Sequence, residues 1–192
     1  VDYIVLDDEK VLTVFTANQA FLLLMDFWSA QLVKENLWNN HPRFMIKTTA
    51  SALSWDEWAR SKGVQVVNVP VGFKEIANIM KKVELQLKNN PDKEVVVDDV
   101  FGNSINLGVD PRLVFGGEES GGMIMGTEDL IESQNGRLAV AMREKSATEA
   151  IVVASALIAQ LKSDGIYLSE YLERVFNEND IKGRFDTRVD IS

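Results

Sequence analysis

Stretches typical of strands and of helices alternate along most of this chain, and that alternation limits the folds it can adopt. Short runs rich in β-branched and other apolar residues are expected to form strands at residues 44–48, 64–69 and 95–97. Longer stretches with apolar residues at helical spacing come before the first of these strands, over about 17–38, and between the last two, over about 73–88. The alternation indicates an α/β domain, in which helices cover a mixed or parallel sheet.

Three capping boxes predict where helices begin, because paired side chains can bond to each other's backbone N–H groups there. The boxes are Thr16 with Gln19, Ser54 with Glu57, and Ser146 with Glu149. The third opens a nearly all-apolar helix over about 147–162, which we therefore expect to be buried on all sides. A last helix is expected over about 169–178, and residues 100–111 are expected to form a loop.

The composition fits a soluble globular domain and narrows the range of partners. Of the 192 residues 46% are hydrophobic and none is cysteine, so disulfides and thiolate chemistry are excluded and a cytoplasmic location is expected. The net charge of −9 argues against nucleic acid and anionic membranes as partners. The same charge means that a phosphate-bearing substrate would need local cations. No apolar run has the length needed to span a membrane.

A glycine-rich loop at residues 115–122 is the strongest candidate for chemistry. It reads Phe-Gly-Gly-Glu-Glu-Ser-Gly-Gly between two strand-like runs. Glycine lets the backbone approach a ligand closely, and a carboxylate can accept two donors at once, as adjacent sugar hydroxyls would offer. We interpret the loop as polyol-binding through Glu118 and Ser120. The alternative is a β-hairpin turn with solvated acids.

Lys145 is a second candidate because it directly precedes the helix N-cap Ser146. The partial positive charge of a helix N-terminus disfavours an ammonium ion, and Arg143 would add to this effect if it faces the same way. Glu144 could oppose it. These groups would suit Lys145 to general acid–base catalysis, whereas the alternative is a solvated lysine at a loop–helix junction.

A third candidate is the turn Pro70-Val71-Gly72-Phe73-Lys74, which leads from a strand into a helix. Backbone N–H groups at the start of a helix attract anions. The same pattern also fits an ordinary loop that connects a strand to a helix.

The sequence gives less support for a histidine-based catalytic triad, a nucleotide-binding loop or a metal site. The single histidine, His41, lies beside Pro42 without a G-x-S-x-G pattern, and neither a Walker loop nor a dinucleotide fingerprint is present. The acidic residues at 7–9 and 98–99 could hold a hard cation or form solvated turns.

The three candidate motifs occur in one order and together resemble the third domain of the α-D-phosphohexomutases, the family of phosphoglucomutase and phosphomannomutase. The order is 70–74, then 117–121, then 143–145 before an apolar helix. The Gly-Glu-Glu-Ser form is more similar to the phosphoglucomutase branch. The resemblance covers roughly residues 2–175.

The resemblance implies an enzyme that moves a phosphoryl group between O1 and O6 of a hexose, with a hexose 1,6-bisphosphate as intermediate and activator. A phosphoserine in the first domain would be the donor, an acidic loop of the second would bind Mg²⁺, and the fourth would hold the non-reacting phosphate. In this chain Glu118 and Ser120 would contact sugar hydroxyls, and Lys145 would be the general acid/base. Gly72 and Phe73 would belong to a loop that touches the hexose phosphate.

The same resemblance implies a division of the chain. Residues 1–16 would end the second domain, 17–178 would form the third, and 179–192 would lead towards a fourth domain of the same polypeptide. Asp2 falls where the metal loop would end, but Tyr3 stands where the family usually has arginine, so the role of Asp2 as a ligand stays open.

Ser146-Ala147 follows Lys145 where Asp-Gly is common in the family. We expect a fragment of a phosphoglucomutase-like enzyme that is inactive alone, because the phosphoryl donor and the phosphate-binding domain would be missing. The alternative is a stand-alone, non-catalytic sugar-phosphate-binding or assembly module.

Overall fold

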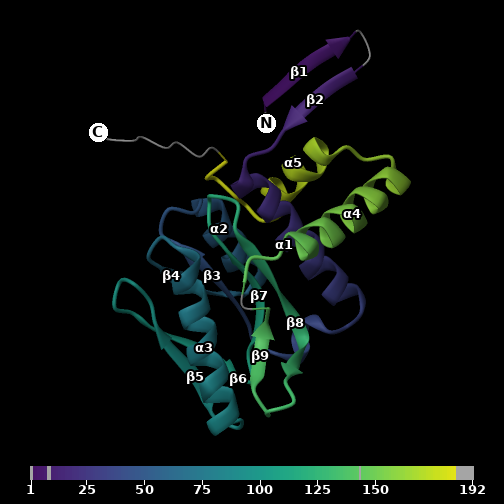
Figure 1. The fold of residues 1–192 in the computed structure, drawn as a ribbon. Coiled ribbons are helices and arrows are strands. Elements are labelled where there is room, and N and C mark those ends of the chain that lie inside the picture. Colours follow the sequence, from purple (N-terminus) through teal and green to yellow (C-terminus); the bar gives the residue numbers. More distant parts are fainter. Residues whose placement is uncertain (1, 8–9, 143, 185–192) are drawn as a thin grey trace.

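A five-stranded mixed sheet forms the centre of the molecule (Figure 1). The computed structural model describes residues 2–7, 10–142 and 144–184, and for 2–7 and 10–12 it describes the backbone alone. The strands of the sheet are β3 (Arg43–Thr48), β4 (Gln65–Val69), β7 (Arg112–Gly117), β8 (Met123–Glu132) and β9 (Leu138–Ala141). Their spatial order is β4-β3-β7-β8-β9. The first three run parallel, and β8 and β9 are each antiparallel to the strand before.

Helices cover both faces of this sheet (Figure 1). One face carries α1 (Ala17–Lys34), α2 (Leu53–Lys62), α4 (Ala147–Asp164) and α5 (Leu168–Glu178), and the other carries α3 (Phe73–Asn89). Successive strand residues point to opposite faces, so Met45 packs with the first group and Phe44 with the second. The predicted α/β fold with a mixed sheet is therefore confirmed.

Two hairpins lie outside the central sheet. β1 (Asp2–Asp7) and β2 (Lys10–Val14) pair antiparallel and stand away from the body in Figure 1. β5 (Glu94–Asp98) and β6 (Ser104–Val109) also pair antiparallel, and they pack against α3. A short 3-10 turn, η1 (Trp38–Asn40), follows α1, which ends earlier than expected.

The prediction of a loop over residues 100–111 was wrong, because β6 occupies half of this range. Its alternating Ile105 and Leu107 turn inward, and Leu107 is buried in the core under α3. The Asp99 carboxylate accepts bonds from the backbone N–H groups of Phe101 and Asn103, both at 2.9 Å, and so builds the turn that starts the strand. Asp99 therefore has a structural use as a turn former.

The capping box predicted at the start of α2 was also wrong. The first box, at Thr16, forms both of its bonds, but α2 begins at Leu53 after Ala52, which makes no side-chain capping bond. Instead, the Ala52 N–H donates to Asn18 of α1 at 3.2 Å. Glu57 accepts two backbone N–H groups, at residues 182 and 183, so it is not available to cap. Tertiary contacts replace the local cap at this site.

Helix α4 is not buried on all sides, contrary to the expectation from its composition. It packs against α1 and β8 through one face, on which Leu157 and Leu161 are buried. On the opposite face Ile151, Val152 and Ile158 are 65%, 63% and 50% exposed. An all-apolar helix can lie at a surface when only one of its faces has a partner.

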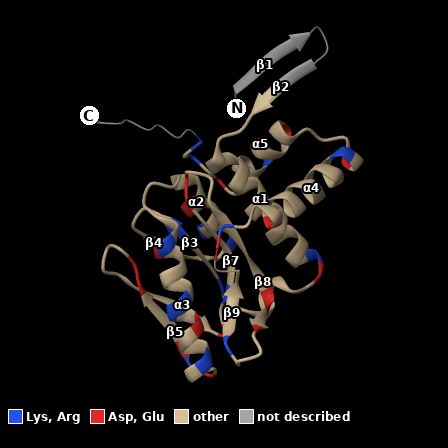
Figure 2. Cartoon of the chain, in the orientation of Figure 1, with Lys and Arg blue, Asp and Glu red and all other residues tan. Residues whose placement is uncertain are grey.

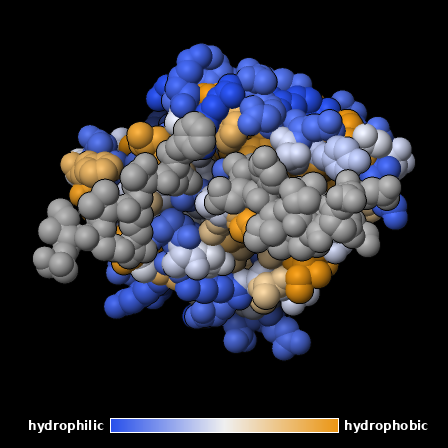
Figure 3. All heavy atoms as spheres, turned by 90° about the horizontal axis from the view of Figure 1, so that it is seen from above, coloured by the Kyte–Doolittle hydropathy of each residue, from blue (hydrophilic) through white to orange (hydrophobic). Residues whose placement is uncertain are grey.

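Charged residues are confined to the two ends of α4, and Figure 2 shows its middle without acids or bases. Figure 3 shows the molecule from above, with hydrophobic side chains in separate patches among hydrophilic ones. No single helix in the described ranges is long and apolar enough to cross a bilayer, and the one pair that would suffice together, α4 with α5, is bent by 97°.

A buried polar cluster joins three of the helices on this face. Asp26 of α1 accepts a bond from the indole N–H of Trp58 in α2 at 3.0 Å and one from the Tyr171 hydroxyl in α5 at 2.8 Å. Lys62 adds an ion pair at 3.3 Å from its partly exposed position. Burial, followed by the charge of Asp26, raises the pKa of Tyr171 well above its ordinary value.

Candidate functional site

The candidate site lies at the carboxyl edge of the three parallel strands. Because β3, β4 and β7 run the same way, the segments that follow them meet at one edge of the sheet. These segments include the turn at Gly72 and the loop that begins at Glu118. The start of α4 is held beside them, since the N–H of its N-cap Ser146 donates to the Met123 carbonyl of β8 at 3.1 Å.

Three of the predicted site residues form one cluster. The Lys145 ammonium nitrogen lies 2.5 Å from Oε1 of Glu118 and 5.5 Å from the centre of the Phe73 ring. The Glu118 side chain is only 6% exposed, whereas that of Lys145 is 52% exposed. A buried, fixed carboxylate thus holds a lysine that still reaches solvent, and an aromatic ring supports the cation.

A side chain at position 122 would crowd this ion pair. A Cβ there would lie 2.6 Å from Oε1 of Glu118 and 2.7 Å from Cε of Lys145. The loop closes through bonds from the Glu118 N–H to the Gly122 carbonyl at 2.9 Å and from the Gly121 N–H to the Glu118 carbonyl at 3.1 Å. Its backbone is therefore the turn of a β7–β8 hairpin, as the alternative interpretation proposed, but its acids are not free solvated groups.

Gly72 and Ser120 take different places in the site. Gly72 has φ of +126°, a conformation that side chains rarely adopt, and it is the residue from which α3 begins. Ser120 is exposed at the tip of the hairpin turn, two residues after Glu118 in sequence. It therefore faces solvent at the same edge of the sheet.

The electrostatic surroundings of Lys145 differ from those expected. Its counter-ion is Glu118 at the end of β7 rather than the neighbouring Glu144, which is exposed. Arg143 lies outside the described residues. Ser146 caps α4 by accepting the Glu149 N–H at 3.2 Å, but the Glu149 carboxylate accepts the Met125 N–H of β8 instead of completing the box. That bond ties the helix start, and with it Lys145, to the sheet.

Sequence reasoning missed the residues on the other side of the loop. Thr48, at the end of β3, donates its hydroxyl to Glu119 at 2.9 Å and lies 2.9 Å from the Ser51 hydroxyl. Behind them Lys47 is buried, 2.5 Å from Asp56. The sequence does contain a signal for these residues. Polar residues at the carboxyl end of a buried parallel strand, such as Lys47 and Thr48, commonly face a binding or active site.

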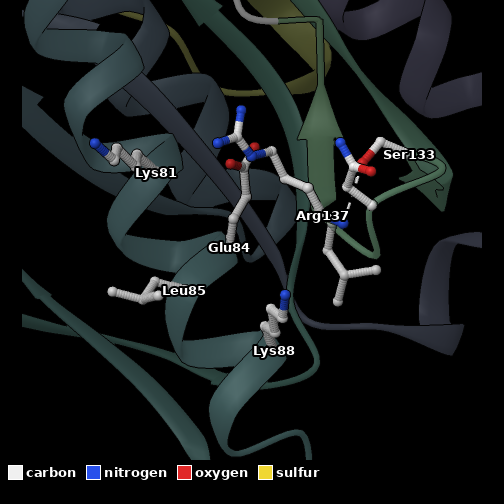
Figure 4. Close-up of a pocket in the computed structure, with 8 residues that line it drawn as sticks. Lys81, Glu84, Leu85, Lys88, Ser133 and Arg137 are labelled. Atoms are coloured by element: carbon white, nitrogen blue, oxygen red, sulfur yellow. Dashed lines mark hydrogen bonds between the residues drawn. The ribbon is translucent and has the colours of Figure 1, made fainter.

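Other candidate groups lie elsewhere. His41 precedes the amino end of β3, the opposite edge, with Nδ1 at 3.1 Å from the Asp110 carbonyl oxygen. A cavity of about 560 Å³ lies between the second half of α3 and the β8–β9 turn (Figure 4). Lys81, Lys88 and Arg137 line it, and it contains none of the predicted site residues.

The described residues do not offer a metal site. Among them, no three acidic or histidine side chains gather closely enough to hold a metal ion, and the side chain of Asp2 is not described. Residues 8–9 of the acidic stretch near the N-terminus also lie outside the described residues, and Asp98 bonds to the Ser104 hydroxyl at 2.7 Å.

Comparison with known families decides the relationship. The family model for "Phosphoglucomutase/phosphomannomutase, alpha/beta/alpha domain III" matches residues 16–178. The chain belongs to this family. The three motifs of this phosphohexomutase domain are thus the segments that the structure brings to one edge of the sheet.

A solved structure of a protein from Thermus thermophilus, assigned as a phosphomannomutase, is similar to this chain at 20% identity with a TM-score of 0.47. The match covers 86% of this chain and 26% of that protein. No match was found among curated proteins.

Proposed function

We propose that this chain is the sugar-binding domain of a phosphohexomutase that interconverts hexose 1-phosphate and hexose 6-phosphate. The observation that carries the proposal is the Glu118–Lys145 ion pair at 2.5 Å, with Phe73 beside it. It joins residues from all three motifs of the family domain in one cluster. Such an arrangement presents an acceptor for hydroxyls and a solvent-reaching proton carrier side by side.

Each residue of the cluster has a distinct role in the proposed mechanism. Glu118 accepts bonds from sugar hydroxyls, and Ser120 adds a hydroxyl that can donate or accept. Lys145, in its neutral amine form, takes the proton from the attacking sugar hydroxyl in one half of the reaction, and the ammonium so formed gives that proton to the leaving sugar oxygen in the other half. Gly72 and Phe73 shape the wall, and Phe73 limits where the Lys145 ammonium can lie.

The remaining parts of the reaction are assigned to other domains of the same polypeptide. A phosphoserine would donate the phosphoryl group, Mg²⁺ would neutralise charge on it, and a hexose 1,6-bisphosphate would be the intermediate. This division fits an acidic domain with net charge −9, which need only recognise hydroxyls. We expect such an enzyme in the cytoplasm.

The proposal is tested in the full-length enzyme that contains this chain. Glu118→Ala should lower kcat/KM by about 10- to 150-fold, as expected for loss of a hydrogen bond to a charged group worth about 1.5–3 kcal/mol. Lys145→Met should lower kcat itself, since it removes the proton carrier. The matched control is Lys162→Met, the same substitution at an exposed position near the other end of α4. Unchanged kcat/KM in Glu118→Ala would refute the assignment.

Two further measurements separate this enzyme from a stand-alone module. The isolated chain, supplied with Mg²⁺ and hexose 1,6-bisphosphate, should show no mutase turnover. The intact mass of the native gene product should be several-fold above the 21.5 kDa of this chain. A native mass near 21.5 kDa would favour the non-catalytic binding module instead.

A further inference from the structure

The two adjacent glutamates of the glycine-rich loop have different partners on opposite sides. Glu118 pairs with Lys145, whereas Oε2 of Glu119 accepts the hydroxyl of Thr48 at 2.9 Å. Thr48 is completely buried and is the last residue of β3. One acid is therefore directed to the proposed catalytic lysine and the other to the sheet.

The direction of the hydrogen bonds defines a short chain of donors. A hydroxyl has one proton to donate. Since Thr48 gives its proton to Glu119, the Ser51 hydroxyl, 2.9 Å from Thr48 Oγ1, must donate to Thr48. A hydrogen bond to an ionised carboxylate is roughly twice as strong as a neutral one, and a donor behind it strengthens it further.

The segment that carries Ser51 is itself fixed by a buried cation. The Lys47 ammonium lies 3.2 Å from the Ser51 carbonyl oxygen and 3.1 Å from that of Ala52, and it pairs with Asp56 at 2.5 Å. Lys47 is only 2% exposed. The donor chain thus rests on rigid structure and not on a mobile loop.

We propose that Thr48, supported by Ser51, is a positioning residue that anchors the loop through Glu119, and that Glu119 is an anchor and not a sugar ligand. The inference rests on the proposed function, because the purpose of the anchor is to keep Glu118 and Ser120 directed at the sugar. Two glycines precede the Glu-Glu-Ser tip and two follow it, so a contact with β3, added to the two bonds that close the turn, further restricts the conformations of its backbone.

The first test is carried out on this chain and does not depend on catalysis. Backbone ¹⁵N order parameters would be measured for residues 117–122 in the wild type, Thr48→Val and Thr48→Ser. We expect values near 0.85 in the wild type to fall below about 0.6 in Thr48→Val and to recover in Thr48→Ser, which keeps the hydroxyl. Thr49→Val is the matched control, because Thr49 is the exposed neighbour. An equally rigid loop in Thr48→Val would overturn the proposal.

The second test uses the full-length enzyme. Thr48→Val should lower kcat/KM about tenfold, Thr48→Ser should restore it, and Thr49→Val should leave it unchanged. If Glu118→Ala impairs turnover but Thr48→Val neither loosens the loop nor impairs turnover, the anchor is refuted and the proposed function survives. If Thr48→Val loosens the loop but Glu118→Ala leaves turnover unchanged, the proposed function fails while the anchoring contact stands.

Discussion

Removal of the Asp26 carboxylate is the perturbation whose effect on stability the structure defines most closely. In Asp26→Ala, the indole N–H of Trp58 and the hydroxyl of Tyr171 both lose their acceptor inside the core. Trp58 is 0% and Tyr171 is 5% exposed, so water does not readily replace it. Each buried unsatisfied donor costs about 1–3 kcal/mol, and we expect a total loss of about 3–5 kcal/mol.

That loss is large compared with the total free energy of unfolding of a typical domain, about 5–15 kcal/mol. For a chain of this size it corresponds to a fall in Tm of about 6–20 °C. The assay is urea unfolding followed by tryptophan fluorescence, with the midpoint and slope fitted separately. The matched control is Lys62→Met, because Lys62 pairs with the same carboxylate from a position that is 32% exposed. It should cost less than about 1 kcal/mol.

A double-mutant cycle then tests the reasoning itself. In the Asp26→Ala background, Tyr171→Phe removes the very donor that was left unpaired, so it should cost less than it does in the wild type, or even stabilise. Strict additivity of the two substitutions, or a loss below about 1 kcal/mol for Asp26→Ala alone, would refute the claim that this cluster joins α1, α2 and α5.

The remaining predictions concern pH and the site glycine. Because the pKa of Tyr171 is raised in the folded state, first by burial and then by Asp26, its contribution to stability is complete below the unfolded-state pKa, about 10, and is lost as pH rises above it. Wild type should therefore lose stability between about pH 10 and 11 with an extra slope of up to about 1.4 kcal/mol per pH unit, and Tyr171→Phe should lack that slope in urea titrations. Gly122→Ala should cost less than about 1 kcal/mol of stability but should separate Glu118 from Lys145, because the added Cβ would lie 2.6 Å from the carboxylate and the two flexible side chains can move apart. In the full-length enzyme it should impair kcat/KM as Glu118→Ala does, and wild-type kinetics in Gly122→Ala would contradict the ion pair's proposed role.

The sequence predicted the general fold because its signals are local. Strand-like and helix-like runs identify α/β architecture without knowledge of any contact, and the β3 and β4 segments were found nearly as the structure has them. The errors arose where a distant partner decides the outcome. The start of α2 depends on Asn18 of another helix, and the exposure of Ile151 depends on which face of α4 has a neighbour.

The candidate site shows the same contrast between local signals in the sequence and contacts with distant residues. Glu118, Lys145 and Phe73 could be selected from motifs, but their meeting required the parallel pairing of β3 with β7 and the position of α4. The partnership of Thr48 with Glu119 could not be predicted, since it depends on a strand register that no local pattern encodes.

The parallel arrangement of β3, β4 and β7 has a consequence for how the domain folds. Thr48 and Glu119 are separated by 71 positions in the chain, so their contact requires β7 to dock beside β3. Contacts between distant segments carry a high entropic cost and form slowly. The site is therefore absent from any form of the chain in which β7 is not docked beside β3. Fraying of the outer β5–β6 hairpin would leave it intact, whereas release of β7 would abolish it at once.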